Sequence, residues 1–195
     1  MNEAAGAPSE RQAELLEAAY DYALAHGLAD VSLRPLAAAI GSSPRVLLFL
    51  FGSKEGLIRA LLARARADEL TVIDALRKGQ AATDLTGAAA LVWEWLSAPD
   101  HRGLLNLWVE AYARSLVEAE GPWAGFAAQT VNDWLDLFAE LQPPPRRRSA
   151  AGAAERTRTL AVLRGALLDL LATGDLERTT AAVHQHLAVP QSNRG

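Results

Sequence analysis

The stretch SLRPLAAAIGSSPRVLLFLFGSKEGLIRALL, residues 32–62, decides how this sequence folds. Within it, residues 33–40 carry apolar side chains at helical spacing, and Gly41 then provides a common stop after a short helix. Ser32 precedes this helix, at the position where a hydroxyl can accept a hydrogen bond from an amide of the first turn. We therefore expect a short helix between Ser32 and Gly41.

A second short helix is expected directly after the Gly41-Ser42 turn. Ser43 is a suitable cap and Pro44 a suitable first residue, because proline has no N–H to leave unpaired in the first turn. This helix should run to about Phe51. Two short helices joined by a glycine turn are the pattern of a helix-turn-helix.

Helices are also expected on both sides of this pair. On the N-terminal side, apolar residues recur at helical spacing from Glu10 to His26, namely Leu15, Leu16, Ala19, Tyr22 and Ala23. A long helix is expected from Ser53 to roughly Lys78, and five more are expected over residues 84–97, 101–118, 123–141, 152–172 and 175–188. The segment PPPRRRS, residues 143–149, is expected to be a loop with solvated arginines.

These patterns predict an all-α fold of about nine helices, with a helix-turn-helix domain over residues 1–52 and a second helical domain over residues 53–195. Half of the 195 residues are hydrophobic, and there is no cysteine, which excludes disulfides and thiolate metal sites. Neither a secretory signal nor an apolar run long enough to span a bilayer is apparent, so we expect a cytoplasmic protein with no membrane partner.

No catalytic or metal-binding motif stands out, and neither an enzyme activity nor a cofactor is expected. His184 and His186 are two residues apart, which points them to different sides of a helix and argues against a shared metal. An enzyme that uses His101 as a general base is the one catalytic alternative, and a loss of turnover in His101→Ala would be its test.

Charge is distributed unevenly along the chain, although the net charge is only −4. Residues 1–31 contain one basic side chain against six acidic ones, whereas residues 32–66 contain six basic side chains against one acidic one. Positive charge is therefore concentrated on the helix-turn-helix segment, which is where the binding of DNA phosphates would need it.

The sequence from Arg11 to Leu62 resembles the DNA-binding domain of the tetracycline-repressor (TetR) family. The resemblance is carried by LLEAAYDYALAHG at 15–27, SLRPLAAAIG at 32–41 and FGSKEGLIRALL at 51–62. The C-terminal run RGALLDLLATGDLERTTAAVHQHL, residues 164–187, is similar to the last helix pair of that family, which forms the dimer bundle.

The resemblance implies that residues 42–50 enter the major groove of double-stranded DNA and that Lys54 holds a phosphate. The residues expected to contact DNA are Ser32, Arg34, Ser42, Ser43, Arg45, Val46, Leu48, Phe49 and Lys54. Arg45 is the best candidate for a base contact, because a guanidinium donates to guanine through two N–H groups; the alternative is an exposed surface arginine. Leu48 and Phe49 stand where the family usually has a phosphate-gripping Tyr and a polar residue.

The middle of the chain is rich in aromatic residues, which suits either a packed core or a cavity for a small molecule. The residues expected near such a cavity are Trp93, Trp108, Tyr112, Phe126 and Trp134. Polar contacts to the ligand could come from His101, Asn106, Glu110 and Asn132. For any one of the aromatic residues, a role in the core is the more common outcome.

The leucine-rich end of the chain predicts a helix hairpin that serves as a homodimer interface, with an ordinary intramolecular helix pair as the alternative. The interface residues expected are Leu160, Leu163, Leu167, Leu171, Val183 and Leu187. Together with the resemblance, this predicts a dimeric repressor that binds a palindromic operator and is released by a small apolar or aromatic effector. The alternative is a protein of the same fold that binds a small molecule or another protein and no longer reads DNA.

Overall fold

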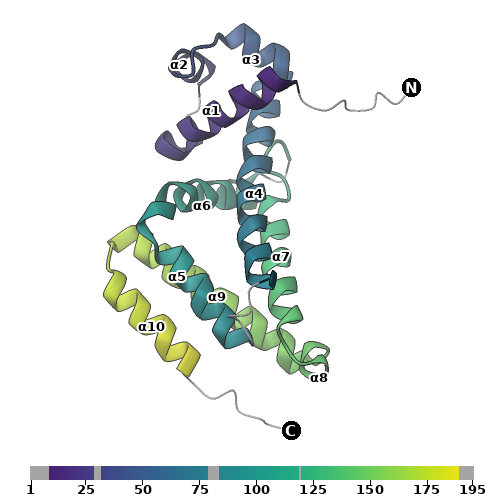
Figure 1. Cartoon of the computed structure of the whole chain (residues 1–195), viewed down its shortest axis with the longest axis vertical. Coiled ribbons are helices and arrows are strands. Elements are labelled where there is room, and N and C mark those ends of the chain that lie inside the picture. The colour runs from purple at the N-terminus through teal and green to yellow at the C-terminus, as the bar shows by residue number, and fades with distance from the viewer. Residues whose placement is uncertain (1–8, 29–31, 79–83, 119, 189–195) are drawn as a thin grey trace, which may run out of the picture. The chain divides into compact units, whose positions relative to one another are not determined.

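The computed structural model describes residues 9–28, 32–78, 84–118 and 120–188. All regular elements in these ranges are helices, which confirms the predicted all-α class. The structure has ten α-helices and one 3-10 helix over the described residues, against the nine helices expected (Figure 1). Their bounds are α1 (Glu10–His26), α2 (Leu33–Ala39), α3 (Pro44–Phe51), α4 (Lys54–Lys78), α5 (Leu85–Ser97), η1 (Pro99–His101), α6 (Arg102–Val117), α7 (Phe126–Glu140), α8 (Pro144–Arg147), α9 (Ala150–Thr173) and α10 (Leu176–Ala188).

The helices form two compact units. Unit 1 comprises residues 1–66 and 106–126, and unit 2 comprises residues 67–105 and 127–195. Helices α4 and α6 therefore contribute to both units, with α4 divided after Arg66 and α6 divided before Asn106. The domain boundary predicted at residue 52 follows the last residue of α3, whereas packing assigns the first turns of α4 to unit 1 as well.

Unit 1 is built around the buried faces of the first four helices. Ser9 caps α1 by accepting a hydrogen bond from the Gln12 amide at 3.2 Å. Tyr20 is buried in α1, with 2 % of its surface exposed, whereas Tyr22, which was expected on the core face, is only partly buried. The guanidinium carbon of Arg64 lies 4.8 Å from the centre of the Tyr20 ring, so α4 covers this part of α1.

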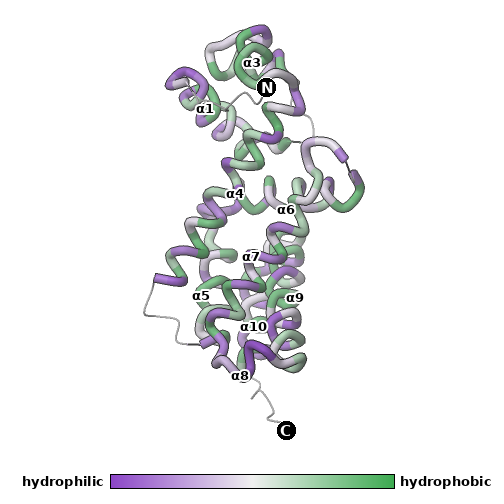
Figure 2. Tube along the Cα trace, turned by 90° about the vertical axis from the view of Figure 1, so that its right-hand side faces the viewer, coloured by the Kyte–Doolittle hydropathy of each residue, from purple (hydrophilic) through white to green (hydrophobic). Residues whose placement is uncertain are grey.

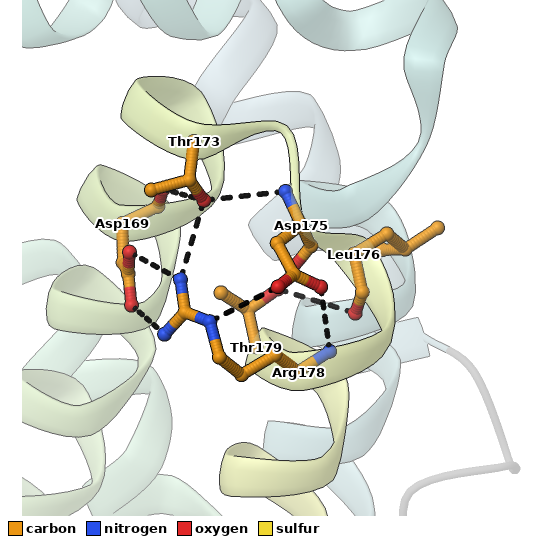
Figure 3. A network of polar contacts seen from close by, with 6 residues as sticks. All are labelled: Asp169, Thr173, Asp175, Leu176, Arg178 and Thr179. Atoms are coloured by element: carbon orange, nitrogen blue, oxygen red, sulfur yellow. Dashed lines mark hydrogen bonds and ion pairs between the residues drawn. The ribbon is translucent and has the colours of Figure 1, made fainter.

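Unit 2 is a bundle in which α9 and α10 pack against each other and against α5 (Figure 1). The turn between α9 and α10 is closed by Arg178, which donates to both carboxylate oxygens of Asp169 at 2.6 and 2.7 Å and to Asp175 at 3.1 Å (Figure 3). The hydrogen bonds from Arg178 lower the pKa of the Asp169 carboxyl below its ordinary value. The hairpin is thus fixed by a bidentate ion pair as well as by its apolar contacts.

The segment expected to be a loop at residues 143–149 contains the short helix α8, so that prediction was wrong. Pro144 and Pro145 occupy its first turn, where a missing N–H removes no helical hydrogen bond. The arginines are also not simply solvated. Arg147 donates to the carbonyl oxygens of Ala139 and Glu140 at the end of α7, at 2.6 Å each.

None of the helices over the described residues is both long enough and apolar enough to cross a membrane by itself. Helices α2 and α3 are long and apolar enough only when they are taken together, and the chain bends by 102° between them.

Candidate nucleic-acid interface

A tight turn sets the geometry of α2 and α3. Gly41 has a φ of 64°, in the left-handed region that favours glycine, and the Ser42 amide donates to the Ala37 carbonyl at 2.8 Å. The chain bends by 102° across this turn. Such an angle between two short helices joined by a glycine turn is that of a helix-turn-helix, as the sequence predicted.

Helix α3 is anchored at both ends and by one buried side chain. At its N-terminus, Ser43 Oγ accepts a hydrogen bond from the Val46 amide at 3.3 Å, as expected for a cap. Leu47 is fully buried and holds the middle of the helix against unit 1. At the C-terminal end, the side-chain amide of Gln12 on α1 donates to the Leu50 carbonyl at 2.9 Å. These contacts fix the orientation of the opposite, exposed face.

The exposed face of α3 combines one cation with large apolar groups. Arg45, Leu48 and Phe49 are exposed and lie three and four residues apart, which places them on one side of the helix. Phe49 has 85 % of its surface exposed, Leu48 has 40 % and Val46 has 39 %. Figure 2 shows by colour that most residues of α3 are hydrophobic. Large apolar side chains exposed together on one helix, as Val46, Leu48 and Phe49 are, are typical of interaction surfaces.

The start of α4 forms a second part of this surface. Ser53 Oγ accepts a hydrogen bond from the Gly56 amide at 3.0 Å, and the exposed Lys54 is the first residue of the helix. Hydrogen bonding of Glu55 to its own backbone amide and to Ser53 lowers the pKa of its carboxyl. This start of a long helix, with a lysine beside it, has the chemistry of a phosphate contact.

The nine residues predicted to contact DNA all lie in unit 1, and solvent reaches every one of them. Eight are exposed, and Ser42 is partly buried in the turn. Arg34 is exposed on α2, before the glycine turn. Ser32 precedes α2 but makes no capping hydrogen bond through its side chain, so the expected cap is wrong; its carbonyl accepts from the Leu36 amide at 3.1 Å instead.

The aromatic residues expected near a ligand cavity are divided between the units. Trp108, Tyr112 and Phe126 belong to unit 1, where the Trp108 and Tyr112 rings lie 5.0 Å apart, and Trp93 and Trp134 belong to the hydrophobic core of unit 2. Trp93 is 1 % exposed and donates through Nε1 to Thr180 Oγ1 at 3.0 Å. Trp93 and Trp134 are therefore core residues of unit 2.

Sequence reasoning missed Glu69, a buried acidic residue of unit 2. Its carboxylate accepts hydrogen bonds from Trp134 Nε1 at 2.5 Å and from Thr130 Oγ1 at 3.3 Å, and only 7 % of its surface is exposed. The signal that could have revealed it is its place in the apolar stripe of α4, four residues after Ala65 and four before Ile73.

The polar residues expected to contact a ligand are either exposed or bonded to other groups of the protein. The Nδ1 atom of His101 is 2.7 Å from the Trp95 carbonyl oxygen, and the two rings are stacked with centres 4.3 Å apart. Asn106 and Asn132 are exposed, and Glu110 bonds to the backbone of Leu28 in unit 1. Over the described ranges, no three His, Asp or Glu side chains come together as metal ligands would.

The leucines expected at a dimer interface are turned toward the interior of unit 2. Leu160, Leu163, Leu167 and Val183 are buried, while Leu171 and Leu187 are partly buried. The other side of α9 is exposed and consists mostly of small residues, in a stripe made of Ala154, Arg158, Ala161, Gly165, Leu168 and Ala172. The stripe repeats every three or four residues, as a helix-packing face does.

Comparison with known proteins supports the identity of the helix-turn-helix unit. Residues 15–61 match the model of the family described as bacterial regulatory proteins, tetR family. This segment runs from α1 through the first turns of α4 and contains the turn and exposed face described above. No match was found among curated protein sequences.

Solved structures with the same fold extend over nearly the whole chain. A Rhodococcus sp. protein described as a TetR-family transcriptional regulator is 18% identical, with a TM-score of 0.74, and covers 94% of this chain and 100% of its own. The multidrug binding protein EbrR, in complex with imidazole, is 25% identical, with a TM-score of 0.65 and coverages of 98% and 100%. A TetR transcription regulator from Haloarcula marismortui is 16% identical, with a TM-score of 0.71 and coverages of 91% and 94%. Residues 15–61 therefore match the tetR family of bacterial regulatory proteins, and the chain shares its fold with these solved structures.

Proposed function

We propose that the chain is a homodimeric repressor that binds a palindromic DNA operator and is released by a small apolar or aromatic effector. The observation that carries the proposal is the joint exposure of Arg45 on α3 and Lys54 at the start of α4, both in unit 1. A guanidinium on a recognition helix can donate to guanine, and an ammonium at a helix start can bind phosphate. Because residues 15–61 match a family of bacterial regulatory proteins, we propose a regulator rather than an enzyme.

The charge pattern supports this assignment of roles. The six basic side chains of residues 32–66 include Arg34, Arg45, Lys54 and Arg59, which are all exposed. The rest of the chain has an excess of acidic residues, because the net charge of the whole is −4. The concentration of positive charge on residues 32–66 directs this segment toward a polyanion, and its contribution to affinity falls as the salt concentration rises.

The proposed dimer contact is the exposed stripe of α9, which replaces the buried leucines in this role. Ala161 and Gly165 would let a second helix approach closely, and Leu168, which is 51 % exposed, would provide apolar contact. A dimer built on a two-fold axis would present two copies of α3 to successive major grooves, roughly 34 Å apart.

For the effector, we propose contacts to the Glu69, Thr130 and Trp134 cluster. EbrR was crystallised with imidazole and with proflavin, which are aromatic nitrogen compounds. In the present chain, a buried carboxylate beside an indole would suit a ligand with an aromatic ring and an N–H or cationic group. Because α4 and α6 contribute to both units, they are the elements through which an effector would shift the population of DNA-binding states.

DNA binding is tested by exposing the purified chain to a library of random duplexes and sequencing the retained fraction. We expect enrichment of a palindrome. Arg45→Ala should lose preference at one base pair of each half-site, and Lys54→Ala should weaken binding evenly across sequences and reduce its salt dependence. The absence of any enriched sequence would refute the repressor and favour a protein of this fold that no longer reads DNA.

The dimer and the effector site are tested separately. In sedimentation experiments, Leu168→Arg should give monomers, whereas Leu116→Arg, at a 68 % exposed position of α6 in unit 1, should leave the oligomeric state unchanged. Binding of proflavin and of imidazole can be followed by tryptophan fluorescence. Glu69→Gln should weaken both, with Glu94→Gln, an exposed change in the same unit, as the control.

A further inference from the structure

We propose that α3 reads thymine methyl groups, so that each operator half-site contains neighbouring A·T pairs next to the G·C pair contacted by Arg45. This inference rests on the proposed DNA-binding function and adds the chemistry by which bases are distinguished. It comes from the side chains that α3 exposes rather than from the family, whose members usually carry other residues at Leu48 and Phe49.

The exposed face of α3 offers little hydrogen-bonding capacity. Beyond Arg45, its exposed side chains after the cap are Val46, Leu48 and Phe49, none of which has a polar atom. The hydroxyl of Ser43 accepts from the Val46 amide, which leaves its O–H as one further donor at the start of the helix. After Ser43 and Arg45, no exposed side chain of α3 can recognise a base through hydrogen bonds.

In the major groove, the one apolar group that differs between base pairs is the methyl group of thymine. Phe49 is 85 % exposed and lies four residues, or about one helical turn, after Arg45. The ring of Phe49 would therefore lie near the base that the Arg45 guanidinium contacts. Leu48 lies beside it, three residues from Arg45. These two side chains are therefore placed to cover methyl groups next to a guanine.

Charge around this apolar face selects DNA over an apolar protein partner. Arg34 before the turn, Arg45 on the helix itself and Lys54 after it are all exposed cations. The nearest acidic side chain in the sequence is Glu55, which is engaged with its own helix start. An apolar stripe framed by cations matches a groove that has methyl groups on its floor and phosphates on both edges.

The experiment uses the duplex enriched by the full-length chain and replaces single thymines by deoxyuridine. This exchange removes the methyl group and leaves base pairing and the O4 acceptor unchanged. We expect a loss of about four-fold in affinity for each methyl group that the protein covers. Uracil placed outside the half-sites is the matched control and should have no effect.

Two single variants, Phe49→Ala and Leu48→Ala, assign the effect to α3, and circular dichroism checks that each is folded. In these variants the difference in affinity between the thymine and uracil duplexes at the covered positions should disappear. If wild-type protein binds its enriched duplex specifically but does not distinguish thymine from uracil, the inference is wrong while the proposed function stands. If no duplex is enriched at all, the proposed function fails and the inference fails with it.

Discussion

The carboxylate of Glu110 on α6 accepts a hydrogen bond from the backbone N–H of Leu28, just beyond the end of α1, at 2.8 Å. Both residues belong to unit 1. Gly27 comes immediately before Leu28 with a φ of 80°, and a Cβ at Gly27 would lie 3.0 Å from the same carboxylate oxygen. Helix α6 is thus bonded, within unit 1, to the backbone just after α1.

Glu110→Ala should therefore destabilise unit 1. A hydrogen bond to a charged acceptor contributes roughly 1.5–3 kcal/mol, and its loss would leave the Leu28 amide without that partner. Glu110→Gln keeps an acceptor oxygen and should lose less. Urea unfolding followed by circular dichroism measures both changes. Equal stability of the alanine variant and the wild type would show that this bond does not hold α6 in place.

Gly56→Ala should disrupt the start of α4 because a Cβ at this position would lie 2.0 Å from the backbone oxygen of Phe51. The backbone would have to shift, at a cost of roughly 1–3 kcal/mol, and Lys54 would move with it. Ala63→Ser, at an exposed position of the same helix, is the control and should stay within about 0.5 kcal/mol of the wild type. Thermal unfolding in which Gly56→Ala is as stable as Ala63→Ser would show that the close approach at Gly56 is not needed.

His186 should make the protein less stable as the pH falls below neutrality. Burial, followed by the nearby charge of Arg158, lowers the pKa of this imidazole below its ordinary value of 6.5, and its Nε2 atom is buried without a hydrogen-bond partner among the described residues. As the pH falls through 6.5, His186 becomes protonated in the unfolded chain but stays neutral in the folded chain. The free energy of unfolding therefore declines until the pH reaches the lower pKa that His186 has in the folded chain.

The measurement is the free energy of unfolding between pH 7.5 and 5, at steps of about half a pH unit. His186→Gln should flatten the decline, and His184→Gln, at an exposed position two residues earlier, should leave it as in the wild type. An unchanged slope in the His186 variant would assign the acid sensitivity to other groups.

Gln142→Leu should destabilise unit 2 through lost hydrogen bonds. Gln142 is 4 % exposed, and it donates to Glu155 at 2.9 Å while accepting from Arg156 at 2.5 Å. Glu155 keeps its contact with Arg146 and Arg156 keeps its contact with the Arg147 carbonyl, so the cost is that of the lost hydrogen bonds to charged groups, roughly 1–3 kcal/mol. Gln129→Leu, at an exposed position on α7, should stay within about 0.5 kcal/mol of the wild type. The two variants are compared by chemical unfolding; equal stabilities would contradict the role of Gln142.

Local signals in the sequence predicted the helix-turn-helix correctly, because caps and turns depend on neighbouring residues. Ser43 and Pro44 start α3 where they should, and Gly41 adopts the left-handed backbone that its turn requires. The error at α8 has a local cause as well. A run of prolines forbids the interior of a helix but permits its first turn, and the arginines that follow can continue it.

Other features depend on packing between distant segments, which periodicity alone does not reveal. The pattern of α9 showed that Leu160 and Leu163 share a face, but not whether this face meets α10 of its own chain or another copy. The burial of both leucines within unit 2 answers that question in favour of the intramolecular pair for these residues. The partners of Glu69 could not be predicted for the same reason, since Thr130 and Trp134 lie more than sixty residues away.

The central claim is that α3 and the start of α4 read a specific DNA sequence. Its most direct test compares the affinity of the full-length chain for the enriched palindrome and for a scrambled duplex of equal composition, at physiological salt. We expect the palindrome to bind at least about a thousand-fold more tightly, and Arg45→Ala to remove most of this ratio. Equal affinity for the two duplexes would contradict it and would leave the exposed Phe49 face without a DNA target.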